Sequence, residues 1–287
     1  MGSPRDLLRL LRPQPSGTGI AVFGDPDYDA VAALRQQGGS EITMTQTAHP
    51  DPYAVRNVRS GCGLLYEMHV TRLPETGLEA LNVTGLWKRE YSDELVETFI
   101  GLLASEEQFK NSAHGKRAIH VATHGYYLQA SCGETLTSSV SENPLLLSGL
   151  LLAGANLHGR DFDSLDAEDG ILTALEVSAM DLRGTDLVVL SACETGLGKV
   201  EQGEGVYGLR RAFQMAGAKT VVSSLWKIPD KESMQFMKTL YSTKAKTYPE
   251  LMQQVALRRI REARLRGRPT HPFTWGAFVA TGDWRIR

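Results

Sequence analysis

Two hydrophobic patterns alternate along this chain and predict its architecture. Short apolar runs are typical of buried strands, and stretches in which apolar residues recur every three or four positions are typical of helices. The runs that predict strands lie at 19–26, 117–123, 186–192 and 220–226. The stretches that predict helices lie at 203–216, 230–244 and 249–266. Strands that alternate with helices predict an α/β fold with a central, mostly parallel sheet and helices on both faces.

Weaker patterns fill the rest of the chain. We expect a helix from Ser92 through Leu103, with Ser92 as its N-cap, and a short helix at 173–179. The apolar segment 145–154 is expected to pair with a strand, and the end of the chain (274–287) to form a final strand with a turn at Gly282-Asp283. Residues 1–18 are expected to be a linker or a tag-derived entry, because Met1-Gly2-Ser3 is typical of a cloning remnant, which predicts that the chain is a fragment.

Two of the predicted strands each end at a reactive side chain. One is followed by His124-Gly125 and the other by Cys193-Glu194. Ligands of parallel sheets collect at the carboxyl ends of strands, and an imidazole can take the proton of a thiol. The pair therefore predicts a Cys193–His124 dyad, with the backbone amides of Gly125 and Cys193 as an oxyanion hole. The alternative for each residue alone is structural, since an isolated cysteine is most often a buried apolar residue.

Composition narrows the classes of protein. The chain has 287 residues and a formal net charge of −2, which gives no general attraction to nucleic acid or to an anionic membrane. No apolar run approaches the roughly 20 residues that span a bilayer. Three cysteines, Cys62, Cys132 and Cys193, form no disulfide framework and no zinc spacing, which favours a reducing, cytoplasmic location and no metal.

Several other patterns do not reach a functional motif. Gly196-Leu197-Gly198-Lys199 lacks the first glycine and the final Ser or Thr of a phosphate loop, which weighs against a nucleotide-binding domain. The sequence around Ser191 lacks the GxSxG pattern of hydrolases. The acidic segment 161–170 misses EF-hand spacing and is expected to be a solvated loop. Six arginines crowd 258–268, where we expect a solvated helix face rather than nucleic-acid binding; a docking surface for a partner domain is the other alternative.

The segment after the strand at 220–226 should lie beside the Cys193 loop. Asp230 in Trp226-Lys227-Ile228-Pro229-Asp230 either caps the next helix or lines a substrate pocket. We predict a pocket formed by Asp230, Ser191, Trp226 and Glu194.

The chain resembles the CHAT family of caspase-like peptidases, which are often attached to tetratricopeptide repeats. The resemblance covers 117–284 strongly and 19–116 more weakly, where Phe23-Gly24-Asp25-Pro26 is the best anchor. Its motifs are His120-Val121-Ala122-Thr123-His124-Gly125, Ser148–Gly154, Asp169–Ala174, Leu187–Gly196, Gly203-Glu204-Gly205, Ser224-Leu225-Trp226 and Trp275-Gly276-Ala277-Phe278.

The resemblance implies a caspase-hemoglobinase fold, with an N-terminal subdomain at 19–116 and a catalytic subdomain at 117–287. It implies peptide-bond hydrolysis with His124 as general base and acid, Cys193 as nucleophile and no cofactor. The relative separase has an aspartate, matched here by Asp230, that reads a basic residue before the cut. Ser191, however, stands where metacaspase-like relatives keep an acidic pocket residue.

The resemblance also predicts a biological setting. It implies a regulated cysteine endopeptidase of bacterial immune or stress signalling, with a protein substrate such as a gasdermin-like zymogen and a sensor or tetratricopeptide-repeat partner. An oligomer is compatible with this role. The loops at 129–143 and 161–170 are candidates for ordering on activation or for self-cleavage. The competing interpretation is a catalytically silent caspase-like module for interaction or oligomerisation.

Overall fold

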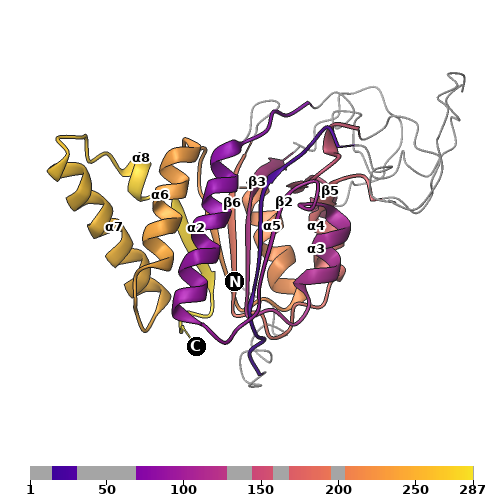
Figure 1. The fold of residues 1–287 in the computed structure, drawn as a ribbon, viewed down its shortest axis with the longest axis horizontal. Helices are drawn as coiled ribbons and strands as arrows, with labels where there is room; N and C mark the ends of the chain where they lie inside the picture. Colours follow the sequence, from indigo (N-terminus) through magenta and orange to yellow (C-terminus); the bar gives the residue numbers. More distant parts are fainter. Residues whose placement is uncertain (1–14, 31–68, 128–143, 158–167, 195–203, 287) are drawn as a thin grey trace, which may run out of the picture.

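One sheet organises the chain in the computed structural model, which describes residues 15–30, 69–127, 144–157, 168–194 and 204–286 (Figure 1). The strand order is β2-β1-β3-β6-β7-β8, and all neighbours are parallel except β7 and β8. These strands are β1 (Ile20–Pro26), β2 (Val96–Gly101), β3 (Ala118–Tyr127), β6 (Leu187–Glu194), β7 (Thr220–Ser224) and β8 (Phe278–Gly282). Two short strands, β4 (Ser148–Leu151) and β5 (Ile171–Thr173), extend the sheet in antiparallel fashion from the end of β3.

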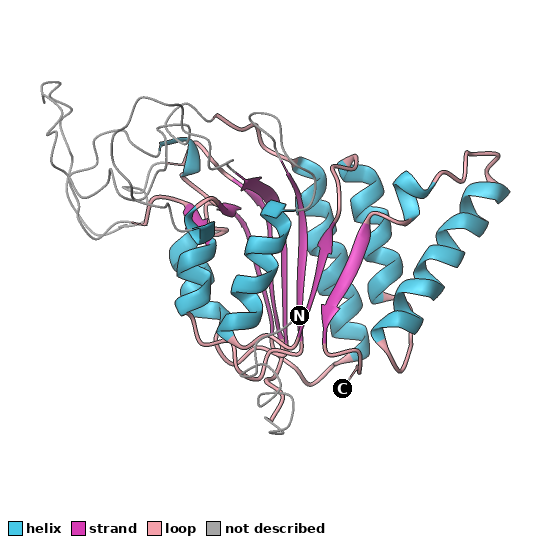
Figure 2. Cartoon of the chain, turned by 180° about the vertical axis from the view of Figure 1, so that it is seen from behind, coloured by secondary structure: helices cyan, strands magenta, loops and turns pink. Residues whose placement is uncertain are grey.

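Helices cover both faces of this sheet (Figures 1 and 2). One face carries α3 (Glu106–Ala113), α4 (Ala174–Ala179) and α5 (Glu204–Ala216). The other face carries α2 (Pro74–Glu90), α6 (Asp230–Tyr241), α7 (Tyr248–Leu265) and the short α8 (Pro272–Trp275). The predicted α/β architecture is therefore confirmed.

The strands show why two faces are needed. In β1, Ala21 and Phe23 pack in the core beneath α3 and α5, whereas Ile20 and Val22 pack in the core beneath α2 and α6. All four side chains are fully buried. Because successive strand residues point to opposite faces, an unbroken apolar run indicates a strand covered on both sides.

The prediction of a helix at 92–103 is wrong, because Val96–Gly101 forms the edge strand β2. Its Val-Glu-Thr-Phe-Ile sequence is rich in β-branched and aromatic residues, which suit a pleated strand, and β2 pairs in parallel with β1. Ser92 therefore caps no helix. The helix of this region is α2, further upstream, which the sequence did not reveal.

The strands that hold the candidate dyad are longer than expected. His124 and Gly125 lie inside β3, which continues to Tyr127 because β4 pairs with its last residues. Likewise, β6 continues through Cys193 to Glu194. The expected end of the strand at residue 123 is thus wrong. Within the described part of the chain, no helix combines the length and apolar composition needed to cross a membrane.

Candidate active site

The sheet brings the two predicted catalytic positions into register. His124 of β3 is the Cα partner of Cys193 in the neighbouring parallel strand β6. Adjacent strands lie about 4.8 Å apart. Two residues 69 positions apart in the sequence are therefore backbone neighbours at the carboxyl end of the sheet, where α/β proteins bind ligands.

A backbone carbonyl fixes the imidazole of His124. Its Nε2 lies 2.9 Å from the carbonyl oxygen of Thr71. A carbonyl can only accept a hydrogen bond, so Nε2 carries the proton and donates it. In the neutral ring this leaves Nδ1 as the basic nitrogen.

The segment that supplies this carbonyl is itself anchored on both sides of Thr71. The Arg72 guanidinium makes a two-pronged ion pair with Asp25 at the end of β1, through Nε to Oδ1 (3.1 Å) and Nη2 to Oδ2 (2.6 Å). The Asn156 side chain accepts from the amide of Val70 and donates to its carbonyl, each at 2.9 Å. A bidentate guanidinium–carboxylate pair restrains direction as well as distance, so the carbonyl is held in place.

A buried tyrosine steadies the backbone of β3 beside the site. The Tyr28 hydroxyl accepts from the amide of His124 (3.3 Å) and bonds Thr123 Oγ1 (2.9 Å). Because Thr123 Oγ1 donates to the carbonyl of Leu151, Tyr28 is the donor to Thr123. Burial raises the pKa of Tyr28 to about 12, so the hydroxyl keeps this proton at neutral pH.

Electrostatics keep the His124 imidazole basic but uncharged. Burial lowers the pKa of His124, against a raising effect from the hydrogen bond to Thr71 and from the charge of Asp230. Lys227 lowers this pKa further. An imidazole with a lowered pKa is neutral at physiological pH and can accept a proton.

Replacing Asp230 with asparagine is expected to lower the pKa of His124 further, because the negative charge that favours the imidazolium is removed. The measurement is NMR titration of the His124 ring protons in the wild type and in Asp230→Asn. The wild-type midpoint should lie below the ordinary 6.5, and the variant midpoint lower still. A midpoint that rises in the variant would contradict this electrostatic assignment.

The residues of the predicted substrate pocket differ in their surroundings. Asp230 is half-buried in the first turn of α6, and Pro229, not Asp230, occupies the N-cap position. Burial raises the pKa of Asp230, with a further rise from Glu75 and a lowering from His124. Ser191 is buried and its hydroxyl bonds Ser233 of α6 at 2.7 Å, which ties it to the core.

The other predicted residues lie at the same end of the sheet. Trp226 is half-buried. It donates its ring N–H to the backbone carbonyl of Phe273 (3.0 Å), and its ring stacks on the Phe273 side chain. Glu194 is the Cα partner of Gly125, which also opposes Leu150 of β4. The oxyanion hole at the amides of Gly125 and Cys193 stays a prediction. Cys62, Cys132, most of the acidic segment and the polar loop 129–143 lie outside the described residues.

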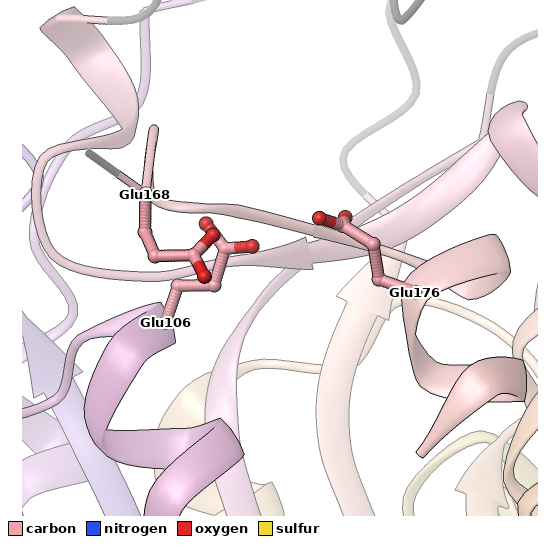
Figure 3. Close-up of side chains that lie close together, drawn as sticks. All are labelled: Glu106, Glu168 and Glu176. Atoms are coloured by element: carbon pink, nitrogen blue, oxygen red, sulfur yellow. The ribbon is translucent and has the colours of Figure 1, made fainter. Parts of the chain in front are cut away.

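A second group of ionisable side chains lies on the face of the sheet that α3 and α4 cover. Its members come from these two helices and from the residues before β5 (Figure 3). Glu106, Glu168 and Glu176 bring carboxylate oxygens within 4.8 Å of one another. Such a cluster could hold a cation, but the Lys110 ammonium already pairs with all three, at 2.8, 2.8 and 3.2 Å respectively. A lysine in this position occupies the place of a metal.

The buried member of this cluster resists ionisation. Burial, the charge of Glu176 and hydrogen bonding to Glu168 raise the pKa of Glu106 to about 10. Burial of Glu168 opposes its ionisation, but hydrogen bonds from Glu106 and Lys110 outweigh this and lower its pKa. Glu106 also accepts from the amide of Gly170 at 3.1 Å. Glu106 therefore helps to hold the segment that leads into β5.

Glu106→Gln is expected to flatten the pH dependence of stability. The folded protein keeps a proton that the unfolded chain releases above its ordinary pKa of 4.5, so the stability that Glu106 contributes falls as pH rises from 4.5 toward about 10. Glutamine does not titrate, so the unfolding free energy of the variant should rise relative to that of the wild type by up to about 1.4 kcal/mol per pH unit in this window. Thermal unfolding across this pH range, with the exposed Glu107→Gln as control, provides the test. Parallel pH profiles for wild type and Glu106→Gln would contradict a protonated Glu106.

Comparison with known proteins gives two curated relatives, both named as tetratricopeptide repeat proteins. The human "Tetratricopeptide repeat protein 28" is 27% identical over 207 residues, which are 65% of this chain and 8% of that protein. The mouse protein of the same name is 28% identical over 161 residues, 51% of this chain and 6% of that protein. The chain thus spans less than a tenth of the length of these relatives.

Similar solved structures are remote in sequence, and the family match is extensive. The match to a structure described as a protease covers 67% of this chain and 39% of the protease chain, with 13% identity and a TM-score of 0.39. The match to a chain of the separase–securin complex of Saccharomyces cerevisiae covers 97% of this chain and 13% of that chain, with 10% identity and a TM-score of 0.42. The CHAT domain family matches residues 1–283. The chain therefore belongs to the CHAT domain family.

Proposed function

We propose that this chain is a cysteine endopeptidase in which His124 activates the Cys193 thiol. The observation that carries the proposal is the hydrogen bond from His124 Nε2 to the carbonyl of Thr71, in a strand whose register pairs His124 with Cys193. A nucleophile, a base and a third group that orients the base are the elements of nucleophilic catalysis.

The reaction follows from these roles. His124 Nδ1 takes the thiol proton as the sulfur attacks the carbonyl carbon of the scissile bond, and Nε2–H stays bonded to Thr71. The imidazolium then gives that proton to the leaving amine as the carbon–nitrogen bond breaks, which leaves a thioester on Cys193. Water then gives a proton to His124 as its oxygen attacks the thioester carbonyl. The carbon–sulfur bond breaks, the acid is released, and the proton returns from His124 to the Cys193 sulfur. No step needs a metal or an organic cofactor.

Asp230 is the proposed specificity residue of this site. It is half-buried at the start of α6, and its charge acts on His124. A carboxylate beside the catalytic base favours a cation in the substrate, so we propose cleavage after arginine or lysine. Ser191 does not contribute, because its hydroxyl is already bonded to Ser233 in the core.

A second candidate function is a silent interaction module. The observation that favours it is the relationship to tetratricopeptide repeat proteins, because repeat arrays build extended binding surfaces. The same relationship supports a repeat-containing or sensor partner that regulates the site. The role in immune or stress signalling, the bacterial source and a gasdermin-like substrate remain predictions from the family resemblance.

The decisive experiment is exposure of the protein to a proteome-derived peptide library, with new termini identified by mass spectrometry. We expect new termini preceded by arginine or lysine, and we expect Asp230→Asn to lose this preference while cleavage continues. The absence of new termini from the folded protein, with and without cell extract as a source of activator, would favour the silent module.

A further inference from the structure

A hollow on the surface of α2, α6 and α7, away from the candidate active site, has more cations than anions among the residues that line it. The three helices lie side by side on one face of the sheet (Figures 1 and 2). Their side chains line a cavity of about 450 Å³ that is open to the surface. This volume is within the range of about 300–1,000 Å³ that is typical of small-molecule sites.

The charge in this hollow is unbalanced. Four cations line it, and Glu262 is the one carboxylate among its lining residues. Glu262 pairs with Arg258 at 3.2 Å. Within the part of the chain that the structure describes, Arg89, Lys238 and Arg266 make no ion pair. Because the whole chain has a net charge of −2, this local excess of positive charge is not a consequence of overall composition.

Three of these cations lie at or near the C-terminal end of a helix. Arg89 lies in the last turn of α2, Lys238 in the last turn of α6, and Arg266 is the C-cap of α7. A helix C-terminus favours a nearby cation, so each site alone is ordinary. Three helices that direct such groups into one cavity create mutual repulsion, which an anion in that cavity would relieve.

The neutral groups of the hollow suit an oxygen-rich ligand. Asn82, Gln235 and Ser242 line it and offer amide and hydroxyl groups, and Ser242 Oγ accepts from Arg258 at 3.4 Å. Arginine binds phosphate through parallel N–H groups, and lysine adds a mobile point charge. The arginines of α7 therefore have different surroundings. Arg258 and Arg266 line the hollow, whereas Arg259 is buried against Glu232.

We propose that this hollow binds a small molecule that carries several phosphate groups, and that the ligand clamps α2, α6 and α7 together. The site is independent of the proposed peptidase activity. Three cations that make no ion pair among the described residues, around a volume of about 450 Å³, favour a small polyanion over an extended acidic chain.

The test is binding of sodium tripolyphosphate to the whole chain, measured by isothermal titration calorimetry and by thermal unfolding at constant ionic strength. We expect saturable binding and a rise in melting temperature of about 2–4 °C at a concentration about ten times Kd. Lys238→Glu with Arg266→Glu should weaken binding by at least about tenfold. Arg261→Glu with Arg264→Glu is the matched control, because both arginines are exposed on α7, line no part of the hollow and give the same change in net charge.

Two further measurements keep the result decisive. If the glutamate pair unfolds, Lys238→Gln with Arg266→Gln removes both charges without adding repulsion and should show the same loss. Equal binding by the hollow variant and the α7 control would overturn the proposal, as would no binding by the wild type at about 1 mM. Preferential binding of a poly-glutamate peptide over tripolyphosphate would also overturn it and would indicate a protein partner.

Discussion

Replacing Cys193 or His124 with alanine is expected to lower kcat/KM for peptide cleavage by at least about a thousandfold. Cys193→Ala removes the nucleophile, and His124→Ala removes both the proton acceptor for the thiol and the donor for the leaving amine. Because the two groups act as a unit, the double variant should be about as impaired as either single variant. The assay is hydrolysis of a peptide chosen from the library screen, measured through the appearance of its new terminus.

Two controls separate catalysis from folding. Cys62→Ala and Cys132→Ala remove the other thiols of the chain and should retain wild-type kcat/KM. Each active-site variant should keep the melting temperature of the wild type to within a few degrees, since His124 is half-buried and lies at the end of the sheet. Cleavage by Cys193→Ala at more than about a tenth of the wild-type rate would rule out the dyad.

Glu79→Ala is expected to cause the largest loss of stability, about 3–5 kcal/mol, or a fall in melting temperature of roughly 6–20 °C. Glu79 of α2 is almost fully buried and its Oε1 lies 3.0 Å from Nε2 of His120, which has no exposed surface. The other ring nitrogen of His120 bonds the Tyr241 hydroxyl of α6 at 3.2 Å. Loss of the carboxylate leaves a buried polar ring without its partner between two helices and the sheet.

Glu90→Ala is the matched control for this prediction. Glu90 ends the same helix and pairs with Lys244, but 47% of its side chain and 83% of the lysine side chain are exposed. An exposed pair contributes no more than about 1 kcal/mol, so this variant should unfold near the wild-type temperature. Equal melting temperatures for Glu79→Ala and Glu90→Ala would show that the buried Glu79–His120–Tyr241 network does not stabilise the fold.

Some elements could be predicted from the sequence because local pattern and tertiary burial agree in them. The apolar runs of β1, β3, β6 and β7 predicted strands, because strands covered on both faces leave no polar side. Thr173 and Glu176 at the start of α4 form a capping box, in which each side chain accepts from the backbone amide of the other residue. The predicted helix at 173–179 is confirmed for this reason.

Other elements depend on contacts that no local pattern records. Helix α2 contains Gly77, Thr84 and Gly85, which are weak helix formers, and it is stabilised by packing against β1. A Cβ at Gly24 of β1 would lie 2.5 Å from the Thr76 carbonyl oxygen, so the helix and strand backbones touch directly. Only a glycine at position 24 permits this approach, and the helix it supports cannot be recognised from its own residues.

The candidate site divides in the same way. His124 and Cys193 were predicted because their side-chain chemistry and strand-end positions are visible in the sequence. Thr71 was not, because it acts through its backbone carbonyl and any residue type has one. The nearest indication is Arg72, whose bidentate pair with Asp25 spans 47 residues of sequence and becomes apparent only in the fold.

The most direct test of the Cys193–His124 dyad is the rate at which iodoacetamide alkylates each cysteine, measured by mass spectrometry in the wild type and in His124→Ala. The proton acceptor beside Cys193 should make this thiol react faster at about pH 7 than Cys62 or Cys132. In His124→Ala the rate at Cys193 should fall to that of an ordinary thiol while the other two rates stay unchanged. An unchanged rate at Cys193 in His124→Ala would contradict the claim that His124 activates Cys193.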